Sequence, residues 1–192
     1  MTTATTETNP ADTLRMTVYA SLSAALIAAG AYMAIPIGPV PIVLQNFFVM
    51  LTALLLGSRW GMGAIAVYLL AGACGLPVFA GGMGGIVRFG GPTGGYLIGY
   101  LPMVLIIGLI VDKTDNRMVY DILAMILGTI ILYVCGVTWL KTVTDIVTGI
   151  TMTWSEAFAV GMYPFLIGDA VKIAVAAPLA RSLRPLIKQF VN

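Results

Sequence analysis

The 192-residue sequence contains no histidine, only two cysteines and no lysine that follows a glycine. Without histidine the chain lacks imidazole metal ligands, Ser-His and Cys-His nucleophile pairs and histidine proton relays. Cys74 and Cys135 each lie inside an apolar run, which indicates neither a disulfide framework nor a metal site. The missing Gly-Lys step excludes the P-loop signature, so any ATP used in this protein's work is hydrolysed by another chain. We therefore expect a protein that is not an enzyme and holds no metal or cofactor.

Charged residues make up only 9% of the chain, whereas hydrophobic residues make up 59% and the mean hydropathy is +0.99. A soluble domain has about 25% charged residues. This composition cannot cover a globule with groups that water solvates, so it predicts a lipid bilayer as the partner, not a nucleic acid. Since a transmembrane helix needs about 20 apolar residues, the chain has room for a handful of spans and little else.

The apolar runs predict an all-α integral membrane protein with a bundle of six transmembrane helices. These runs are 16–34, 44–56, 62–74, 96–111, 119–140 and 157–179. Residues 1–13 are polar and lack the basic start of a signal peptide, so we expect a disordered cytoplasmic tail there. The remaining residues, 14–192, form one predicted transmembrane substrate-binding domain.

The positions of the basic residues predict the orientation. Most cations outside the runs fall on one side of the predicted bundle: Arg15, Arg59, Lys113, Arg117, Arg181, Arg184 and Lys188. The opposite side has only Arg88 and Lys141. The positive-inside rule then places both termini in the cytoplasm. The predicted outer connections, 35–43, 75–95 and 141–156, are longer than the inner turns, and long loops hold function more often than regular elements do.

The outer connection between the third and fourth runs is rich in glycine. It reads GLPVFAGGMGGIVRFGGPTGGY from 75 to 96. Irregular backbone at membrane depth is tolerated only where protein buries it or where it lines a cavity. A flexible extracellular loop is the alternative, but Phe79, Phe89 and their apolar neighbours favour a folded lid or re-entrant loop. For the connection at 141–156, a tolerated insertion stays open.

Two charges interrupt the last run, where Asp169 and Lys172 stand three residues apart on one helix face. A charge at the bilayer centre costs about 2.5–3.5 kcal/mol on insertion scales, so such residues face a bundle interior or a wet cavity. One alternative is that Asp169 and Lys172 only neutralise each other and bind no ligand. Against it, Pro164 predicts a kink in the helix, and glycines in the same stretch leave open space beside the pair. We therefore expect a pocket for a small amphiphilic acid. Its further candidate residues are Arg88, Tyr96, Tyr163, Gln45, Asn46 and Phe79.

Small residues form a stripe on the first run, where Ala20, Ala24 and Ala28 repeat every four residues beside Ala25 and Ala29. Such stripes let helix backbones approach closely. The stripe can serve packing within this chain or docking of another membrane subunit, and the pattern favours neither.

Four segments carry a resemblance to a known family. GLPVFAGG at 75–82, GGPTGGYLIGY at 90–100, GDAVK at 168–172 and the alanine stripe resemble the BioY family of biotin-binding S components of energy-coupling-factor (ECF) vitamin transporters. The resemblance implies a six-helix protein in the bacterial plasma membrane that captures biotin from outside. It also implies a transmembrane coupling subunit, which contacts the alanine stripe, and two cytoplasmic ATPase subunits. By resemblance, Asp169 and Lys172 contact biotin and Arg88 contributes from the loop.

A second function class stays open on the sequence. A stand-alone secondary transporter of a small carboxylate vitamin could use Asp169 and Lys172 as a proton-coupled switch, although no inverted repeat is evident. A membrane-embedded enzyme is disfavoured, because no nucleophile-base pair or intramembrane acidic cluster is present.

Overall fold

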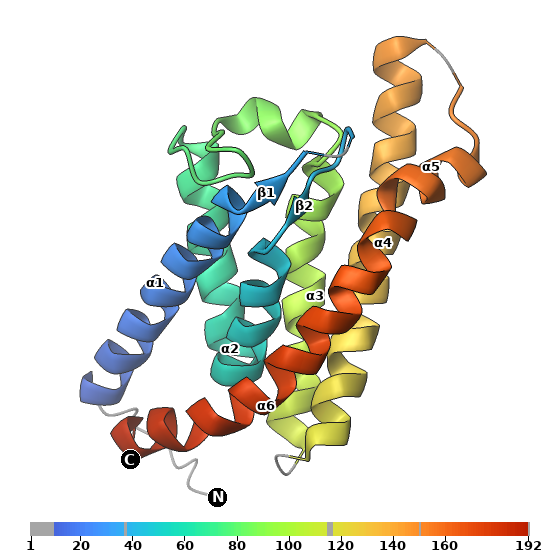
Figure 1. Cartoon of the computed structure of the whole chain (residues 1–192). Coiled ribbons are helices and arrows are strands. Elements are labelled where there is room, and N and C mark those ends of the chain that lie inside the picture. Colours follow the sequence, from blue (N-terminus) through green and yellow to red (C-terminus); the bar gives the residue numbers. More distant parts are fainter. Residues whose placement is uncertain (1–9, 37, 115–116, 150, 192) are drawn as a thin grey trace, which may run out of the picture.

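The computed structural model describes residues 10–36, 38–114, 117–149 and 151–191, which are mostly helical (Figure 1). In chain order the elements are α1 (Pro10–Tyr32), β1 (Ala34–Ile35), β2 (Ile42–Val43), α2 (Gln45–Ala73), the 3-10 helix η1 (Ile86–Gly90), α3 (Gly94–Lys113), α4 (Met118–Thr148), α5 (Trp154–Gly161), the 3-10 helix η2 (Tyr163–Phe165) and α6 (Leu166–Val191). Strands β1 and β2 pair as a short antiparallel hairpin. Helix α1 begins inside the predicted tail 1–13, whose first nine residues lie outside the described ranges.

Five stretches of the described chain are long and apolar enough to cross a membrane. They are Pro10–Tyr32, Gln45–Ala73, Gly94–Lys113, Met118–Val147 and Trp154–Ile187. The predicted runs 44–56 and 62–74 both belong to α2 except for residues 44 and 74, which cap it, and this accounts for the difference from the six spans expected.

Helix α2 is interrupted at Gly57, where φ is 68° and ψ is −168°. The halves on either side of Gly57 run back along each other (Figure 1), and a Cβ built on Gly61 would lie 3.6 Å from the Cα of Ala53. The sharp turn therefore places two apolar helical segments side by side.

Asp112, at the end of α3, stabilises this turn. Its carboxylate accepts hydrogen bonds from the backbone N and the Oγ of Ser58, at 3.0 and 2.6 Å. A Cβ on residue 57 would collide with that carboxylate, and the positive φ also favours glycine. The turn thus requires glycine for two independent reasons.

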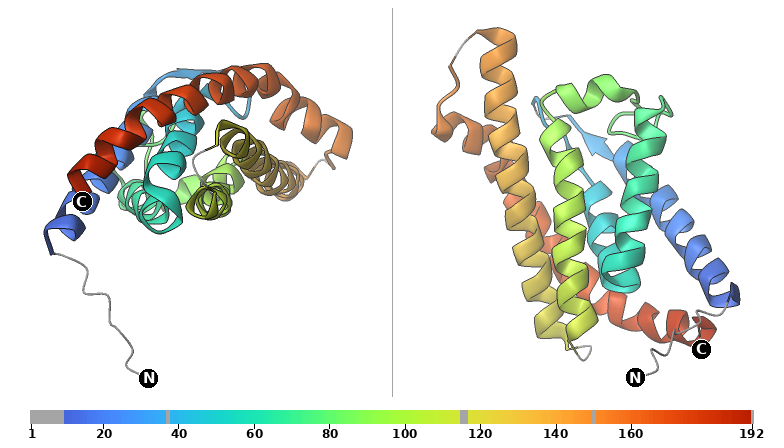
Figure 2. Two further views of the ribbon diagram at one scale, coloured as in Figure 1. Left: turned by 90° about the horizontal axis from the view of Figure 1, so that it is seen from below. Right: turned by 180° about the vertical axis from the view of Figure 1, so that it is seen from behind.

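The two ends of the bundle are built differently (Figures 1 and 2). The start of α1, the end of α6, the turn of α2 and the α3–α4 connection lie at the lower end of Figure 1. The β1–β2 hairpin, η1 and the α4–α5 connection lie at the upper end, and α6 crosses one face of the bundle between the ends. The β1–β2 hairpin and η1 therefore share one end of the bundle.

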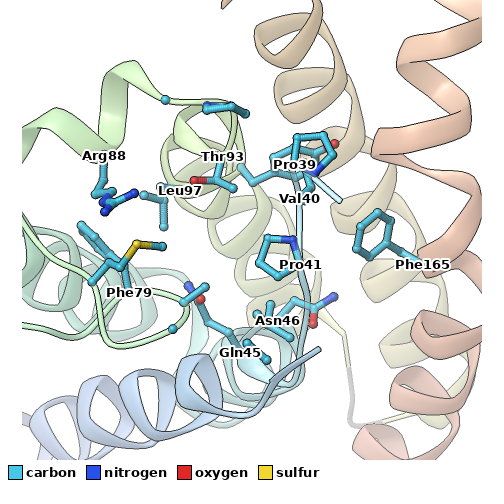
Figure 3. A pocket seen from close by; sticks show the side chains of 18 of the residues that line it. Pro39, Val40, Pro41, Gln45, Asn46, Phe79, Arg88, Thr93, Leu97 and Phe165 are labelled. Carbon is cyan, nitrogen blue, oxygen red and sulfur yellow. The ribbon is translucent and has the colours of Figure 1, made fainter. Parts of the chain in front are cut away.

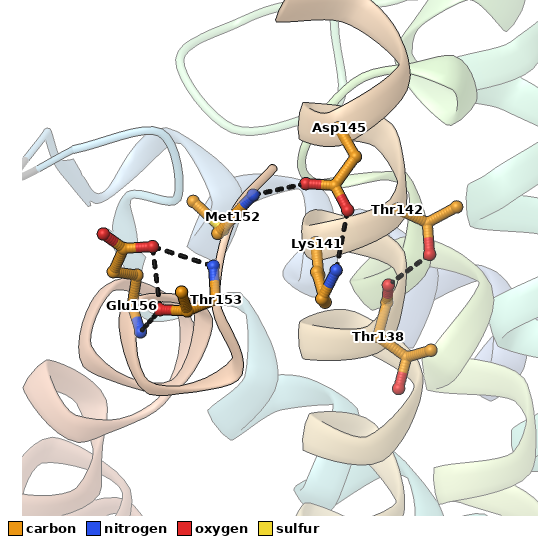
Figure 4. A network of polar contacts seen from close by, with 7 residues as sticks. All are labelled: Thr138, Lys141, Thr142, Asp145, Met152, Thr153 and Glu156. Carbon is orange, nitrogen blue, oxygen red and sulfur yellow. Dashed lines mark hydrogen bonds and ion pairs between the residues drawn. The ribbon is translucent and has the colours of Figure 1, made fainter. Parts of the chain in front are cut away.

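Helix α4 continues through the first half of the segment predicted as a loop at 141–156, so that prediction was wrong for residues 141–148. Asp145 accepts hydrogen bonds from the Lys141 ammonium at 2.6 Å and from the backbone N of Met152 at 2.5 Å (Figure 4). Thr153 and Glu156 then form a capping box that starts α5. Local polar contacts thus extend the helix and fold the chain back tightly.

The predicted kink beside Pro164 is present as a break between two helices. Helix α5 ends at Gly161, the 3-10 turn η2 contains Pro164, and α6 begins at Leu166. The predicted span 157–179 is therefore divided, and Asp169 lies in the first turn of α6, just after the break.

The alanine stripe of α1 divides into an inward and an outward part. Ala20 and Ala24 are buried against this chain's own helices, and Ala28 is half-buried. Ala25 and Ala29 are exposed. Ala20 and Ala24 therefore pack within the chain, Ala25 and Ala29 lie on its exposed face, and the contact of the stripe with a coupling subunit stays a prediction.

Candidate functional site

A cavity of about 530 Å³ lies at the upper end of the bundle, between the β1–β2 hairpin, the segment 79–93 and helices α2, α3, α4 and α6 (Figure 3). Its lining includes all but one of the residues that the sequence singled out for a substrate: Asp169, Lys172, Arg88, Tyr96, Gln45, Asn46 and Phe79. Residues far apart in the sequence thus converge on one space.

The carboxylate of Asp169 is the centre of a buried polar cluster. Its Oδ1 accepts hydrogen bonds from Asn46 Nδ2 at 2.7 Å and from Lys172 Nζ at 3.1 Å. Its Oδ2 accepts a hydrogen bond from the hydroxyl of Tyr133. Charge-assisted bonds of this kind compensate part of the cost of burying a charge.

The ammonium of Lys172 is engaged entirely with protein groups. In addition to Asp169, it donates to Asn46 Oδ1 at 2.6 Å and to the carbonyl oxygen of Val43 at 2.9 Å. An ammonium has three N–H donors, so these contacts use all of them. Lys172 therefore holds α6 against the start of α2 and neutralises the Asp169 carboxylate.

Arg88 lies at the rim of the cavity on η1 and is exposed. Within the described chain, no carboxylate pairs with its guanidinium. The site therefore combines an internally neutral polar wall with an unpaired cation at its mouth, an arrangement suited to a ligand with an anionic end.

The glycine-rich segment is folded around Phe79. Its ring packs edge-on against Tyr68 and Phe89 at centroid distances of 5.6 and 5.7 Å, and it fills the space beside Gly72. An isolated β-bridge joins Phe79 to Met83. These contacts hold η1 and Arg88 over the cavity, as expected for a folded segment.

Aromatic side chains form part of the wall. The hydroxyl of Tyr96 donates to the carbonyl oxygen of Gly161 at 2.6 Å, and the buried Tyr100 lies one helical turn further along α3. Tyr163, in contrast, is 56% exposed and stacks on Phe158 outside the cavity. The 3-10 turn at Pro164 explains this, because it turns residue 163 away from the start of α6.

The comparisons with known proteins agree with this arrangement. A model described as the BioY family matches residues 2–189. The chain belongs to the BioY family. It is 41% identical over 174 residues to the biotin transporter BioY of Thermotoga maritima, covering 90% of this chain and 98% of that protein. It is 38% identical over 164 residues to a probable biotin transporter BioY of Pyrococcus horikoshii, covering 85% and 93%.

A solved structure is also similar to this BioY-family chain. The crystal structure of the S component for biotin from an ECF-type ABC transporter matches it with a TM-score of 0.82 and 29% sequence identity. The match covers 92% of this chain and 94% of that one.

Sequence reasoning missed several cavity residues of this BioY-family chain. Tyr133 lies inside the apolar run 119–140, where a tyrosine reads as packing, yet it bonds to Asp169 across 36 positions of sequence. Val40 and its flanking prolines enter the lining from the β1–β2 hairpin, and Phe165 enters from η2 (Figure 3). For Tyr133, the only signal in the sequence was a hydroxyl inside an apolar run, because a buried hydroxyl needs a hydrogen-bond partner.

A second cavity, of about 450 Å³, lies between α4, α5 and α6. Its lining is apolar except for a few groups that include Thr129, Tyr133 and Asp169. Since the last two also line the first cavity, the Tyr133–Asp169 hydrogen bond forms part of the wall between the two spaces. Within the described residues, no cluster of three metal-ligating side chains is present.

Proposed function

We propose that this chain is the substrate-capture (S) component for biotin uptake across the plasma membrane of a bacterium. The observation that carries the proposal is the cavity itself, which has a neutral, hydrogen-bonding wall at Asp169 and an unpaired guanidinium at Arg88. Biotin has matching ends, a ureido ring with N–H donors and a valerate carboxylate. The relatives named biotin transporters support the same ligand.

The contacts within the cluster favour one orientation of biotin. Lys172 already donates to three protein acceptors, so it has no N–H left for a carboxylate. Arg88 is the remaining cation of the lining and can form a charge-assisted pair with the valerate group. Asp169 and Asn46 then accept from the ureido N–H groups, with aromatic residues Tyr96 and Phe79 at the apolar part of the ligand.

The proposed topology counts both halves of α2 as membrane segments, which gives six. The lower end of Figure 1 then faces the cytoplasm, because it has most of the basic residues of the connections, and both termini lie there. The upper end faces outward, with the glycine-rich segment 75–95 as a lid over the cavity. Residues from α1 onward make up the single substrate-binding domain.

Energy for uptake is proposed to come from other chains, a transmembrane coupling subunit and two cytoplasmic ATPase subunits. The structural match names an ECF-type ABC transporter, and this chain has no P-loop. The face of α1 around Ala25 and Ala29 is the proposed contact with the coupling subunit, since both are exposed and small residues permit close helix approach.

Binding to this face can be tested separately from biotin. Ala25→Leu together with Ala29→Leu is expected to abolish copurification with the coupling subunit while biotin affinity stays unchanged. Ala159→Leu, an exposed alanine on α5, serves as the control. Copurification of the double variant at the wild-type level would reject the assignment of this face.

The ligand is tested by calorimetry and thermal stability with the purified protein in detergent. Biotin is expected to raise the melting temperature, because a ligand that binds only the folded state stabilises it, whereas thiamin and riboflavin are expected to have no effect. Stabilisation by either of those vitamins in place of biotin would reject biotin as the substrate.

A stand-alone proton-coupled carrier of a small carboxylate vitamin is the second candidate. The buried Asp169–Lys172 pair is the observation in its favour, because such intramembrane pairs occur in proton relays. Uptake of biotin into vesicles containing only this chain, driven by a pH gradient, would support the carrier over the S component.

A further inference from the structure

Gln45 is almost completely buried at the start of α2 and lines the cavity beside Asn46 (Figure 3). Among the described residues, its Nε2 is the one buried side-chain nitrogen or oxygen atom without a hydrogen-bond partner. Buried polar groups in native proteins almost always have partners, so an orphaned amide at a cavity indicates that a bound group completes it.

The backbone around Gln45 favours an acceptor at the same place. Gln45 and Asn46 are the first two residues of α2, whose initial N–H groups have no partners within the helix. The N-terminus of a helix also has a partial positive charge, which attracts oxygen atoms. Because the amide of glutamine rotates easily about its last side-chain bond, Nε2 can turn toward such an oxygen.

Two acceptors of biotin could occupy this position, the ureido carbonyl oxygen and the carboxylate. Asn46, adjacent to Gln45, bonds to Asp169, the group that accepts from the ureido N–H. In a ureido ring the carbonyl lies between the two N–H groups, so a ring bound at Asp169 has its oxygen close to the same wall. The carboxylate lies at the far end of the valerate chain and is paired with Arg88 at the rim.

We propose that Gln45 donates a hydrogen bond to the ureido carbonyl oxygen and makes the site selective for a urea over an imino analogue. The inference rests on the proposed function, since it requires biotin in the cavity. It assigns to Gln45 a role that is separate from the Asp169 cluster: Asp169 detects donors on the ring, and Gln45 detects the acceptor between them.

The test measures the affinities of biotin and 2-iminobiotin by calorimetry for the full-length protein. In 2-iminobiotin the carbonyl is replaced by an imino group, which is protonated at neutral pH and only donates. We expect Gln45→Met to weaken biotin binding by about 10- to 100-fold, the usual range for removing one partner of a buried hydrogen bond. We expect Gln45→Glu to weaken biotin binding similarly and to bind 2-iminobiotin more tightly than the wild type does.

The melting temperature without ligand separates recognition from a structural role. Nε2 has no partner in the protein, so Gln45→Met should leave this temperature unchanged or raise it. Thr129→Val is the control, because Thr129 is a buried residue of the second cavity that bonds to the carbonyl oxygen of Met125 and does not line the first. It should leave both affinities unchanged.

Three outcomes would overturn the inference. Wild-type biotin affinity in Gln45→Met would remove Gln45 from recognition, and a fall in both affinity and ligand-free stability would assign it a packing role. An unchanged preference between the two ligands in Gln45→Glu would also reject it, even if Gln45→Met did not fold. If the wild type bound no biotin, the proposed function itself would fail, an outcome that is distinguishable from the other three.

Discussion

Two buried ion pairs place charges of α6 in different surroundings. Arg184, near the lower end, donates to both carboxylate oxygens of Asp121 at 2.9 and 2.8 Å and to the carbonyl oxygen of Leu54 at 3.0 Å. Lys172, near the upper end, pairs with Asp169 at 3.1 Å. The second pair lines the cavity of about 530 Å³, whereas Arg184 and Asp121 are absent from the lining of both cavities described above.

The partners of each pair explain why one is structural and the other is suited to recognition. The planar fork of Arg184 matches both oxygens of Asp121 and so joins α4, α6 and α2 with fixed geometry. Asp169 instead takes its bonds from three separate side chains, all of them at a cavity wall. A buried charge is therefore evidence of a ligand site only where open space adjoins it.

Breaking the lower pair should have the largest effect on stability. Asp121→Ala leaves the Arg184 guanidinium buried without its carboxylate, and loss of one partner of a buried pair costs about 3–5 kcal/mol. We expect a markedly lower melting temperature in detergent, while the folded fraction keeps the wild-type affinity for biotin. Weak biotin binding by the folded fraction would contradict the assignment of a structural role to the Asp121–Arg184 pair and a binding role to the Asp169–Lys172 pair.

Removing the carboxylate charge of the upper pair should lower biotin affinity as well as stability, because the buried Lys172 ammonium then keeps only the oxygens of Asn46 and Val43 as neutral acceptors. Asp169→Asn keeps the shape of the side chain but removes the charge that accepts the ureido N–H groups, and hydrogen bonds to a charged group contribute about 1.5–3 kcal/mol. We expect calorimetry to give a biotin affinity lower by about 10- to 150-fold, the equivalent factor. Asp145→Asn, the same change outside the cavity, is the control. Undiminished affinity in Asp169→Asn would reject the site.

The contrast between these pairs also marks what the sequence could predict. Asp169 and Lys172 share a helix face, so three-residue spacing was enough to predict their contact. The same spacing rule is silent on Asn46, which reaches Asp169 across 123 positions, because only the packing of α2 against α6 brings them together. Arg184 was assigned to the cytoplasmic flank on its charge alone, and its burial follows from a distant aspartate.

The helix boundaries failed where local polar contacts overrode composition. Residues 141–148 are rich in threonine and charge, which is typical of a loop, but Thr142 Oγ1 bonds to the Thr138 carbonyl at 2.9 Å and Lys141 pairs with Asp145 one turn on. These contacts satisfy the polar groups without ending α4. Gly57, in contrast, lies between the predicted runs 44–56 and 62–74, and its positive φ marks the turn that separates them.

Removing the charge at the cavity mouth should have an intermediate effect, on binding only. Arg88 has no carboxylate partner in the described chain, so Arg88→Gln breaks no ion pair and should leave the melting temperature unchanged. An exposed pair contributes at most about 1 kcal/mol, so we expect calorimetry to find biotin binding weakened by about five-fold. The difference from the wild type should shrink at high salt. If the difference persisted at high salt, Arg88 would have to act through a buried contact and not through the proposed exposed ion pair.

The smallest effect is expected at a third pair, Lys141–Asp145, on the α4–α5 connection (Figure 4). This pair is partly exposed and has i,i+4 spacing, so solvent screening leaves it only a small contribution to stability. In Lys141→Gln, the bond from Met152 N to Asp145 remains and continues to hold the connection. The melting temperature should therefore stay within about 2 °C of the wild type, with biotin affinity unchanged. A fall in melting temperature as large as that of Asp121→Ala would mean that burial does not determine how much each ion pair contributes to stability. The α4–α5 connection would then depend on Lys141 more than its exposure implies.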